Sequence, residues 1–194
     1  MTAISRIDAR DLARIAIFAA LIIVLGTVSV PLPGGVPVTG QTLGVMLAGI
    51  VLGPRRGVLA ILVVLALAAI GLPVLAGGRG GLGVFLGPTA GYLLGWIAGV
   101  IVIGLIIGSG SERITWWRVG VAALVGGIPV IYLFGIPVQV AVTGVDLGAT
   151  ALSSLVFVPG DLVKVVLATL LALTLRRAYP PAFSAATRVA DARA

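Results

Sequence analysis

The chain has 194 residues, of which 60% are hydrophobic and only 10% charged, and its formal net charge at pH 7 is +7. A soluble domain carries roughly a quarter of its residues as charged side chains, so this composition excludes a water-soluble globule. It also excludes a disordered chain, which requires low hydrophobicity. The chain has neither cysteine nor histidine, which excludes disulfides, thiolate or imidazole catalysis and His/Cys metal sites. We therefore expect an all-α integral membrane protein.

Apolar stretches bounded by charges, prolines or glycines follow one another along the chain. A helix needs about 20 apolar residues to cross a bilayer, with a range of roughly 17–25. The expected spans are approximately 13–30, 41–53, 57–72, 84–107, 118–136 and 155–175. Pro129 is expected to kink the fifth span. Residues 1–194 form one membrane domain in this prediction, and residues 176–194 form a polar, mobile cytoplasmic tail.

The basic residues predict the orientation of these six transmembrane helices. Of the 13 basic residues, eleven fall on one side of the six-span arrangement. They are Arg6, Arg10, Arg14, Arg55, Arg56, Arg113, Arg118, Arg176, Arg177, Arg188 and Arg193. The positive-inside rule then places both termini in the cytoplasm. Basic residues at several membrane boundaries are typical of contact with anionic lipid, so we expect no nucleic-acid partner.

Asp161 and Lys164 are charged residues within the sixth predicted span. An ionisable side chain at apolar depth is costly and usually marks a site. Their i,i+3 spacing places them on one helix face, where they can hydrogen-bond a polar ligand in an occluded pocket. Two alternatives are that Asp161 only caps the helix while Lys164 reaches the surface, or that the pair only stabilises packing.

A glycine-rich loop around Arg79, between the third and fourth spans, contains Gly78 and Gly80. Glycine backbone can turn sharply and direct N–H groups toward an anion, and Arg79 adds a cation suited to a carboxylate. A tight flexible loop would explain the glycines equally well. Gln41 and Tyr92, at the outward ends of the second and fourth spans, are weaker candidates for ligand contact.

Ala16 and Ala20 lie four residues apart on the first span. Small residues at this interval allow another helix to approach closely within lipid. They can serve a partner interface or packing inside the chain.

Three stretches of the sequence resemble those of a known protein family. They are PVTGQTLGVMLAGIVLGPRRG from Pro37, AIGLPVLAGGRGGLGVFLGPTAGYLLGW from Ala69, and VPGDLVKVVLA from Val158. On these stretches the chain resembles the BioY family, the biotin-specific substrate-binding (S) components of energy-coupling-factor (ECF) transporters.

The resemblance implies a function, a site and partners. The implied function is high-affinity biotin binding for uptake across a prokaryotic cell membrane. Asp161 and Lys164 then match the family's ligand-contacting pair, and Ala16 with Ala20 is similar to its contact motif for a membrane-embedded coupling subunit. That subunit carries two cytoplasmic ATPases, so the S component itself is no enzyme and needs no cofactor or metal.

The chemistry of biotin suits these residues in more than one orientation. Asp161 can accept from a ureido N–H while Arg79 and the loop amides meet the carboxylate, or Lys164 can hold the carboxylate instead. An autonomous biotin transporter without an ATPase partner is the main alternative function. An intramembrane enzyme and a scaffold are weaker alternatives, because the acidic residues show no catalytic pairing and a scaffold leaves Asp161 and Lys164 unexplained.

Overall fold

The computed structural model describes residues 8–27, 29–30, 36–108 and 113–183. The helices are α1 (Ala9–Thr27), α2 (Gln41–Ala69), α3 (Ala90–Ile107), α4 (Trp116–Gly127), α5 (Pro129–Thr143), α6 (Leu147–Ser154) and α7 (Val158–Ala178). Two short strands, β1 (Ser29–Val30) and β2 (Val38–Thr39), pair antiparallel with Ser29 opposite Thr39. Short 3₁₀ turns cover Ala76–Gly78, Leu82–Phe85, Leu155–Phe157 and Pro180–Phe183.

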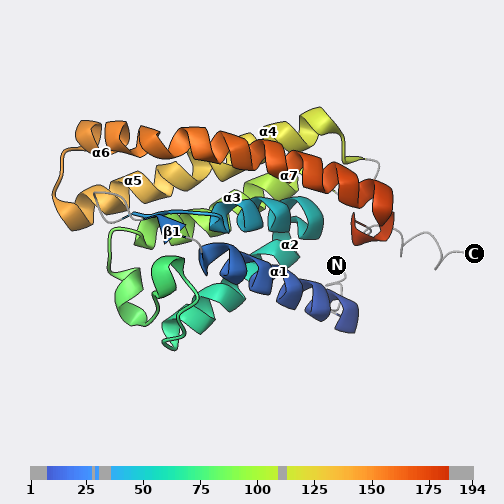
Figure 1. The fold of residues 1–194 in the computed structure, drawn as a ribbon, viewed down its shortest axis with the longest axis horizontal. Coiled ribbons are helices and arrows are strands. Elements are labelled where there is room, and N and C mark those ends of the chain that lie inside the picture. The colour runs from blue at the N-terminus through green and yellow to red at the C-terminus, as the bar shows by residue number, and fades with distance from the viewer. Residues whose placement is uncertain (1–7, 28, 31–35, 109–112, 184–194) are drawn as a thin grey trace, which may run out of the picture.

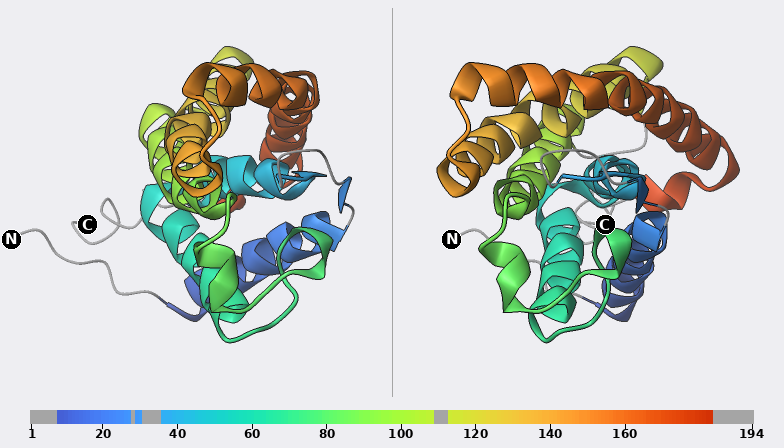
Figure 2. Two further views of the ribbon diagram at one scale, coloured as in Figure 1. Left: turned by 90° about the vertical axis from the view of Figure 1, so that its left-hand side faces the viewer. Right: turned by 60° about the vertical axis from the view of Figure 1, so that its left-hand side comes forward.

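The helices pack in layers around α3 and the first arm of α2. The first arm is the part of α2 before Gly53, and the second arm is the part after it. Figure 2 shows α4 to α7 on one side of this centre, with α1 and the second arm of α2 on the other. Every residue from Gly44 to Leu52 is buried. A helix that is hydrophobic all round belongs in a core, which explains why the first arm of α2 lies at the centre.

The predicted second and third spans are the two arms of α2, which bends sharply at Gly53. Gly53 has φ 74° and ψ −175°, a conformation that glycine adopts without steric cost. Pro54 follows directly and cannot donate a backbone hydrogen bond. After the bend the helix turns back, so that Gly57 lies against the backbone of Ala48.

Several predicted boundaries differ from the observed ones. The helix predicted from residue 13 begins at Ala9, because the Asp8 carboxylate accepts from the backbone N–H of Asp11 at 2.8 Å and caps it. The helix predicted from residue 84 begins at Ala90, since residues 82–85 form a 3₁₀ turn and Pro88 follows it. The fifth span is broken rather than kinked, because Pro129 starts a new helix, α5, which runs on to Thr143.

The segment after residue 175 is more structured than expected. Helix α7 continues through Arg176 and Arg177 to Ala178, and the following 3₁₀ turn buries Phe183 at 5% exposure. This turn packs on α7 and α2. The predicted tail beyond residue 183, with Arg188 and Arg193, lies outside the described residues, as does Arg6.

Among the described residues, four helical stretches are long and apolar enough to cross a membrane. They are Gln41–Ala69, Ala90–Ile107, Trp116–Thr143 and Leu147–Ala178. Helix α1 carries Arg10, Asp11 and Arg14 near its start and is not one of these four. The chain is thus a mostly helical protein with several membrane-spanning candidates, and the six-span topology stays a prediction. In Figure 1, the start of α1 and the end of α7 lie toward one end of the molecule, and the 70–89 connection lies toward the other.

Close approach between α2 and α3 depends on glycine. A Cβ at Gly104 would lie against the backbone of Pro54 and 2.5 Å from its Cδ. We expect Gly104→Ala to destabilise the protein by about 1–3 kcal/mol, because overpacking forces the two helices apart. Thermal unfolding in detergent measures this change. Gly83→Ala is the matched control, since a Cβ there meets nothing within 4 Å, and an equal effect of both changes would contradict the prediction.

Candidate substrate pocket

A pocket lies between α2, α3, α5, α7 and the two connections 36–39 and 75–79. Its empty volume is about 660 Å³, part of which is open to solvent. The polar side chains that line it are Thr39, Gln41, Thr42, Arg79, Thr89, Tyr92, Tyr132, Asp161 and Lys164. The apolar lining is Val36, Pro37, Val38, Leu75, Ala76, Leu93, Trp96, Ile131 and Phe157.

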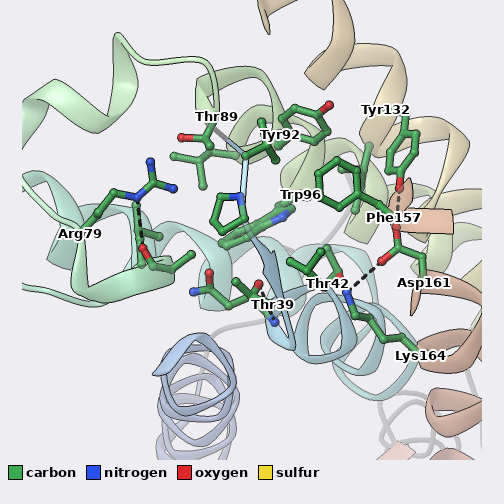
Figure 3. Close-up of a pocket in the computed structure, with 18 residues that line it drawn as sticks. Thr39, Thr42, Arg79, Thr89, Tyr92, Trp96, Tyr132, Phe157, Asp161 and Lys164 are labelled. Carbon is green, nitrogen blue, oxygen red and sulfur yellow. Dashed lines mark hydrogen bonds and ion pairs between the residues drawn. The ribbon is translucent and has the colours of Figure 1, made fainter. Parts of the chain in front are cut away.

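Asp161 is the centre of a polar cluster at one end of this pocket. It is 4% exposed and lies in the first turn of α7, one turn before Lys164. Its Oδ1 lies 2.9 Å from Lys164 Nζ, and its Oδ2 accepts a hydrogen bond from the Tyr132 hydroxyl at 2.6 Å. Lys164 also donates to Thr42 Oγ1 at 2.8 Å. Figure 3 shows this cluster joining α7 to α5 and to the start of α2.

The cluster satisfies the charges that lipid cannot solvate. The side chains of Lys164 and Asp161 are 14% and 6% exposed, and each has the other as its counter-charge. A carboxylate has about four lone-pair positions, so Asp161 can still accept from a ligand N–H after bonding Lys164 and Tyr132. Lys164 has three N–H bonds and uses two of them on Asp161 and Thr42, which leaves one for an acceptor.

Two further polar side chains, Gln139 and Ser154, support the aromatic wall of the pocket. The rings of Tyr92 and Tyr132 meet edge to face, with their centroids 6.1 Å apart. The Tyr92 hydroxyl donates to Gln139 Oε1 at 3.0 Å and lies 3.5 Å from Ser154 Oγ. Both partners are buried, so Tyr92 is held from behind by α5 and α6.

Arg79 lies on a short loop that is held by hydrogen bonds within the loop and by a hydrogen bond to α2. Leu75 and Arg79 exchange backbone hydrogen bonds of 3.0 and 3.3 Å, and the Arg79 Nε–H donates to Ala76 O at 3.1 Å. Gly80 lies directly against the carbonyl of Leu72, where no side chain fits. The Gly81 N–H donates to Ala68 O at 2.7 Å. This loop therefore holds Arg79 in a defined place at the rim of the pocket.

The pocket consequently has two polar ends and an aromatic middle. In Figure 3, Arg79 lies on one side, Asp161 and Lys164 lie on the other, and Trp96 lies between them. Trp96 and Tyr92 line the pocket and are otherwise buried, at 5% and 9% exposure. The arrangement suits an elongated molecule with a hydrogen-bonding head, an apolar body and an anionic end.

Five of the predicted ligand residues come together in this pocket, and two do not line it. Asp161, Lys164, Arg79, Gln41 and Tyr92 are part of its lining. Gly78 and Gly80 are not, because Gly78 is exposed at the turn and Gly80 packs on the Leu72 carbonyl. They shape the loop that carries Arg79. Gln41 is 2% exposed, and its side-chain amide donates to Val74 O at 3.2 Å. This hydrogen bond holds the chain just before the loop that carries Arg79.

Tyr132, Trp96, Phe157 and Thr39 are pocket residues that the sequence predictions missed. Of these, Tyr132 could have been identified from the sequence, because a hydroxyl in an apolar span needs a hydrogen-bond partner just as a charge needs a counter-charge. The same signal marks Gln139 and Ser154. Phe157 and Thr39 carry no such signal, since either residue is ordinary at its position.

Comparison with known proteins gives one consistent result. The model of the BioY family matches residues 1–181. A protein of Rhodobacter capsulatus named biotin transporter BioY is 49% identical over 91% of this chain and 98% of its own. The protein of that name from Rhizobium etli is 47% identical over 88% of this chain and 95% of its own.

A solved structure also has this fold. It is the crystal structure at 2.1 Å of the S-component for biotin from an ECF-type ABC transporter, and it superposes with a TM-score of 0.79. The two chains are 33% identical, and the match covers 87% of this chain and 91% of that one.

The hydrogen bond from Tyr132 to Asp161 can be tested without any ligand. We expect Tyr132→Phe to destabilise the protein by about 1–3 kcal/mol, because it leaves a buried carboxylate oxygen without a partner. Thermal unfolding in detergent is the measurement. Tyr179→Phe is the control, since Tyr179 is 55% exposed, and equal stability of Tyr132→Phe and the wild type would contradict the prediction.

Proposed function

The chain belongs to the BioY family, and on this basis we propose that it is the substrate-binding S component of a biotin importer, with the pocket around Asp161 as its biotin site. It takes part in biotin uptake as a transporter subunit and is not an enzyme. The observation that supports the site is the two-ended pocket, with a buried Asp161–Lys164 pair at one end and Arg79 at the other.

Biotin has the chemistry that this pocket accommodates. Its ureido ring offers two N–H donors and one carbonyl acceptor, its thioether ring and alkyl tail are apolar, and the tail ends in a carboxylate. In the proposed arrangement Asp161 accepts from the ureido group, and Lys164 donates to the ureido carbonyl. Trp96 and Tyr92 cover the apolar part. Arg79 binds the carboxylate near the pocket rim, and Gln41 contributes a further polar contact.

The topology and partners belong to the same proposal. Six membrane spans with both termini in the cytoplasm would place the pocket at the outward end and the exposed basic residues inside. Ala16 and Ala20 are exposed on α1, as a surface for a second helix requires. We assign this surface to a membrane-embedded coupling subunit that carries two cytoplasmic ATPases. The proposed location is the prokaryotic cell membrane.

Biotin binding by the purified protein tests the site. We expect Asp161→Asn and Lys164→Met each to weaken biotin binding at least tenfold, which corresponds to about 1.4 kcal/mol. Isothermal titration in detergent measures the dissociation constants. Asp146→Asn is the matched control, because Asp146 caps α6 outside the pocket and asparagine caps equally well. Unchanged affinity in both pocket variants would contradict the site assignment.

Uptake in cells tests the partner and the autonomous alternative together. We expect wild-type uptake of labelled biotin to require co-expression of the coupling subunit and the ATPases. Ala16→Leu and Ala20→Leu should reduce that uptake on the order of tenfold by preventing close helix contact, with biotin binding unchanged. Ala141→Leu, at an exposed alanine of α5, is the control. Full uptake without the ATPase module would favour an autonomous transporter.

A further inference from the structure

Helix α1 buries one charged side chain, and that side chain points at the bend of α2. The buried residues of α1 are Asp11, Ile15, Ala19, Ile22 and Gly26. Asp11 is 4% exposed, and its Oδ2 lies 2.9 Å from Arg56 Nη2. Arg56 follows the bend at Gly53 and its side chain is 21% exposed. The pair lies at the start of α1, toward the end of the molecule opposite the 70–89 connection (Figure 1).

We propose that the Asp11–Arg56 ion pair fixes the rotation of α1 about its own axis, and that this rotation presents Ala16 and Ala20 to the coupling subunit. The proposal rests on the proposed function, which supplies the partner. It adds a positioning pair that touches neither biotin nor the partner surface.

The close apolar fits between α1 and α2 lie toward the C-terminal end of α1. Apart from Asp11, the buried stripe consists of two isoleucines, one alanine and one glycine. Ile22 packs closely on Gly44 and Gly26 packs on Gln41, whereas nearer the start of the helix only Ile15 and Ala19 are buried beside Asp11. The outer face carries Leu12 and Ile17, each 63% exposed, which would pack on another helix about as well. A charge on one face removes that ambiguity, because only one rotation brings it to its counter-charge.

The helical geometry places the alanines opposite the ion pair. Successive residues of an α-helix are about 100° apart, so Ala20, nine residues after Asp11, lies about 180° from it. Ala16 lies about 140° from Asp11 by the same count. Turning Asp11 inward therefore turns both alanines outward, as their exposure shows.

A second polar contact holds the same half of α1. Arg14 donates from Nη2 to the carbonyl of Pro181 at 3.0 Å. The start of α1 is thus tied to α2 by an ion pair and to the turn after α7 by a hydrogen bond. At its other end, α1 is bonded to the residue that precedes α2, where the Gly40 N–H donates to Leu25 O at 3.1 Å.

Stability alone is a weak reason for such a pair. Buried ion pairs often contribute no more to stability than well-packed apolar residues, and orientation is the best-attested use of buried polar pairs. A role in orientation also predicts a specific defect, in which coupling to the partner fails while the biotin pocket stays intact.

The experiment compares three single variants and one double variant. Asp11→Asn and Arg56→Gln break the pair, and Arg55→Gln removes an equal charge from the neighbouring exposed position as the matched control. The double variant Asp11→Asn/Arg56→Gln leaves no lone charge buried, so it should fold even where a single variant does not. Biotin binding is measured on purified protein, and uptake and co-purification are measured with the coupling subunit and ATPases.

We expect the pair variants, including the double variant, to bind biotin within about twofold of wild type and to lose on the order of tenfold in uptake and co-purification. Arg55→Gln should retain both. Wild-type uptake in the double variant would overturn the proposal, because it would show that the pair only neutralises a buried charge. Equal losses of biotin binding and uptake would also overturn it. Absence of biotin binding in the wild type would instead overturn the proposed function, and this proposal with it.

Discussion

The structure depends on one constraint, which is that lipid solvates no charge. Both ion pairs among the described residues are partly or wholly buried, and both have oxygen–nitrogen distances of 2.9 Å. One, Asp161–Lys164, lies in the pocket, and the other, Asp11–Arg56, lies where α1 meets the bend of α2. In the two proposals made above, the first pair serves ligand binding and the second serves contact with a partner. The buried charges are therefore informative, because each of them needs a specific partner.

Much of this could be predicted from the sequence. The apolar stretches, the break near Gly53 and Pro54, and the pairing of Asp161 with Lys164 follow from patterns of charge and hydrophobicity that act within a few residues. The family resemblance is confirmed by the comparisons. Helix ends were predicted less well, because they depend on single interactions such as the Asp8 cap of α1.

The missed features are those that depend on contacts between distant segments. Tyr132 lies 29 residues before its partner Asp161, and nothing in its local sequence indicates that partner. The Asp11–Arg56 pair was not predicted, because Arg56 was counted only among the basic residues of the cytoplasmic side and Asp11 was not singled out. Gly78 and Gly80 were expected to bind an anion with their amides. Sequence alone could not reveal that Gly80 faces the Leu72 carbonyl.

The loop that carries Arg79 has a consequence for binding thermodynamics. Because Leu75, Ala76 and Ala68 already bond this loop internally and to α2, little backbone freedom remains to be lost when a ligand arrives. A preorganised cation avoids the ordering cost that a flexible loop would incur, and this difference appears mainly as slower ligand dissociation. In the proposed function, retention of biotin would then come from rigidity established during folding.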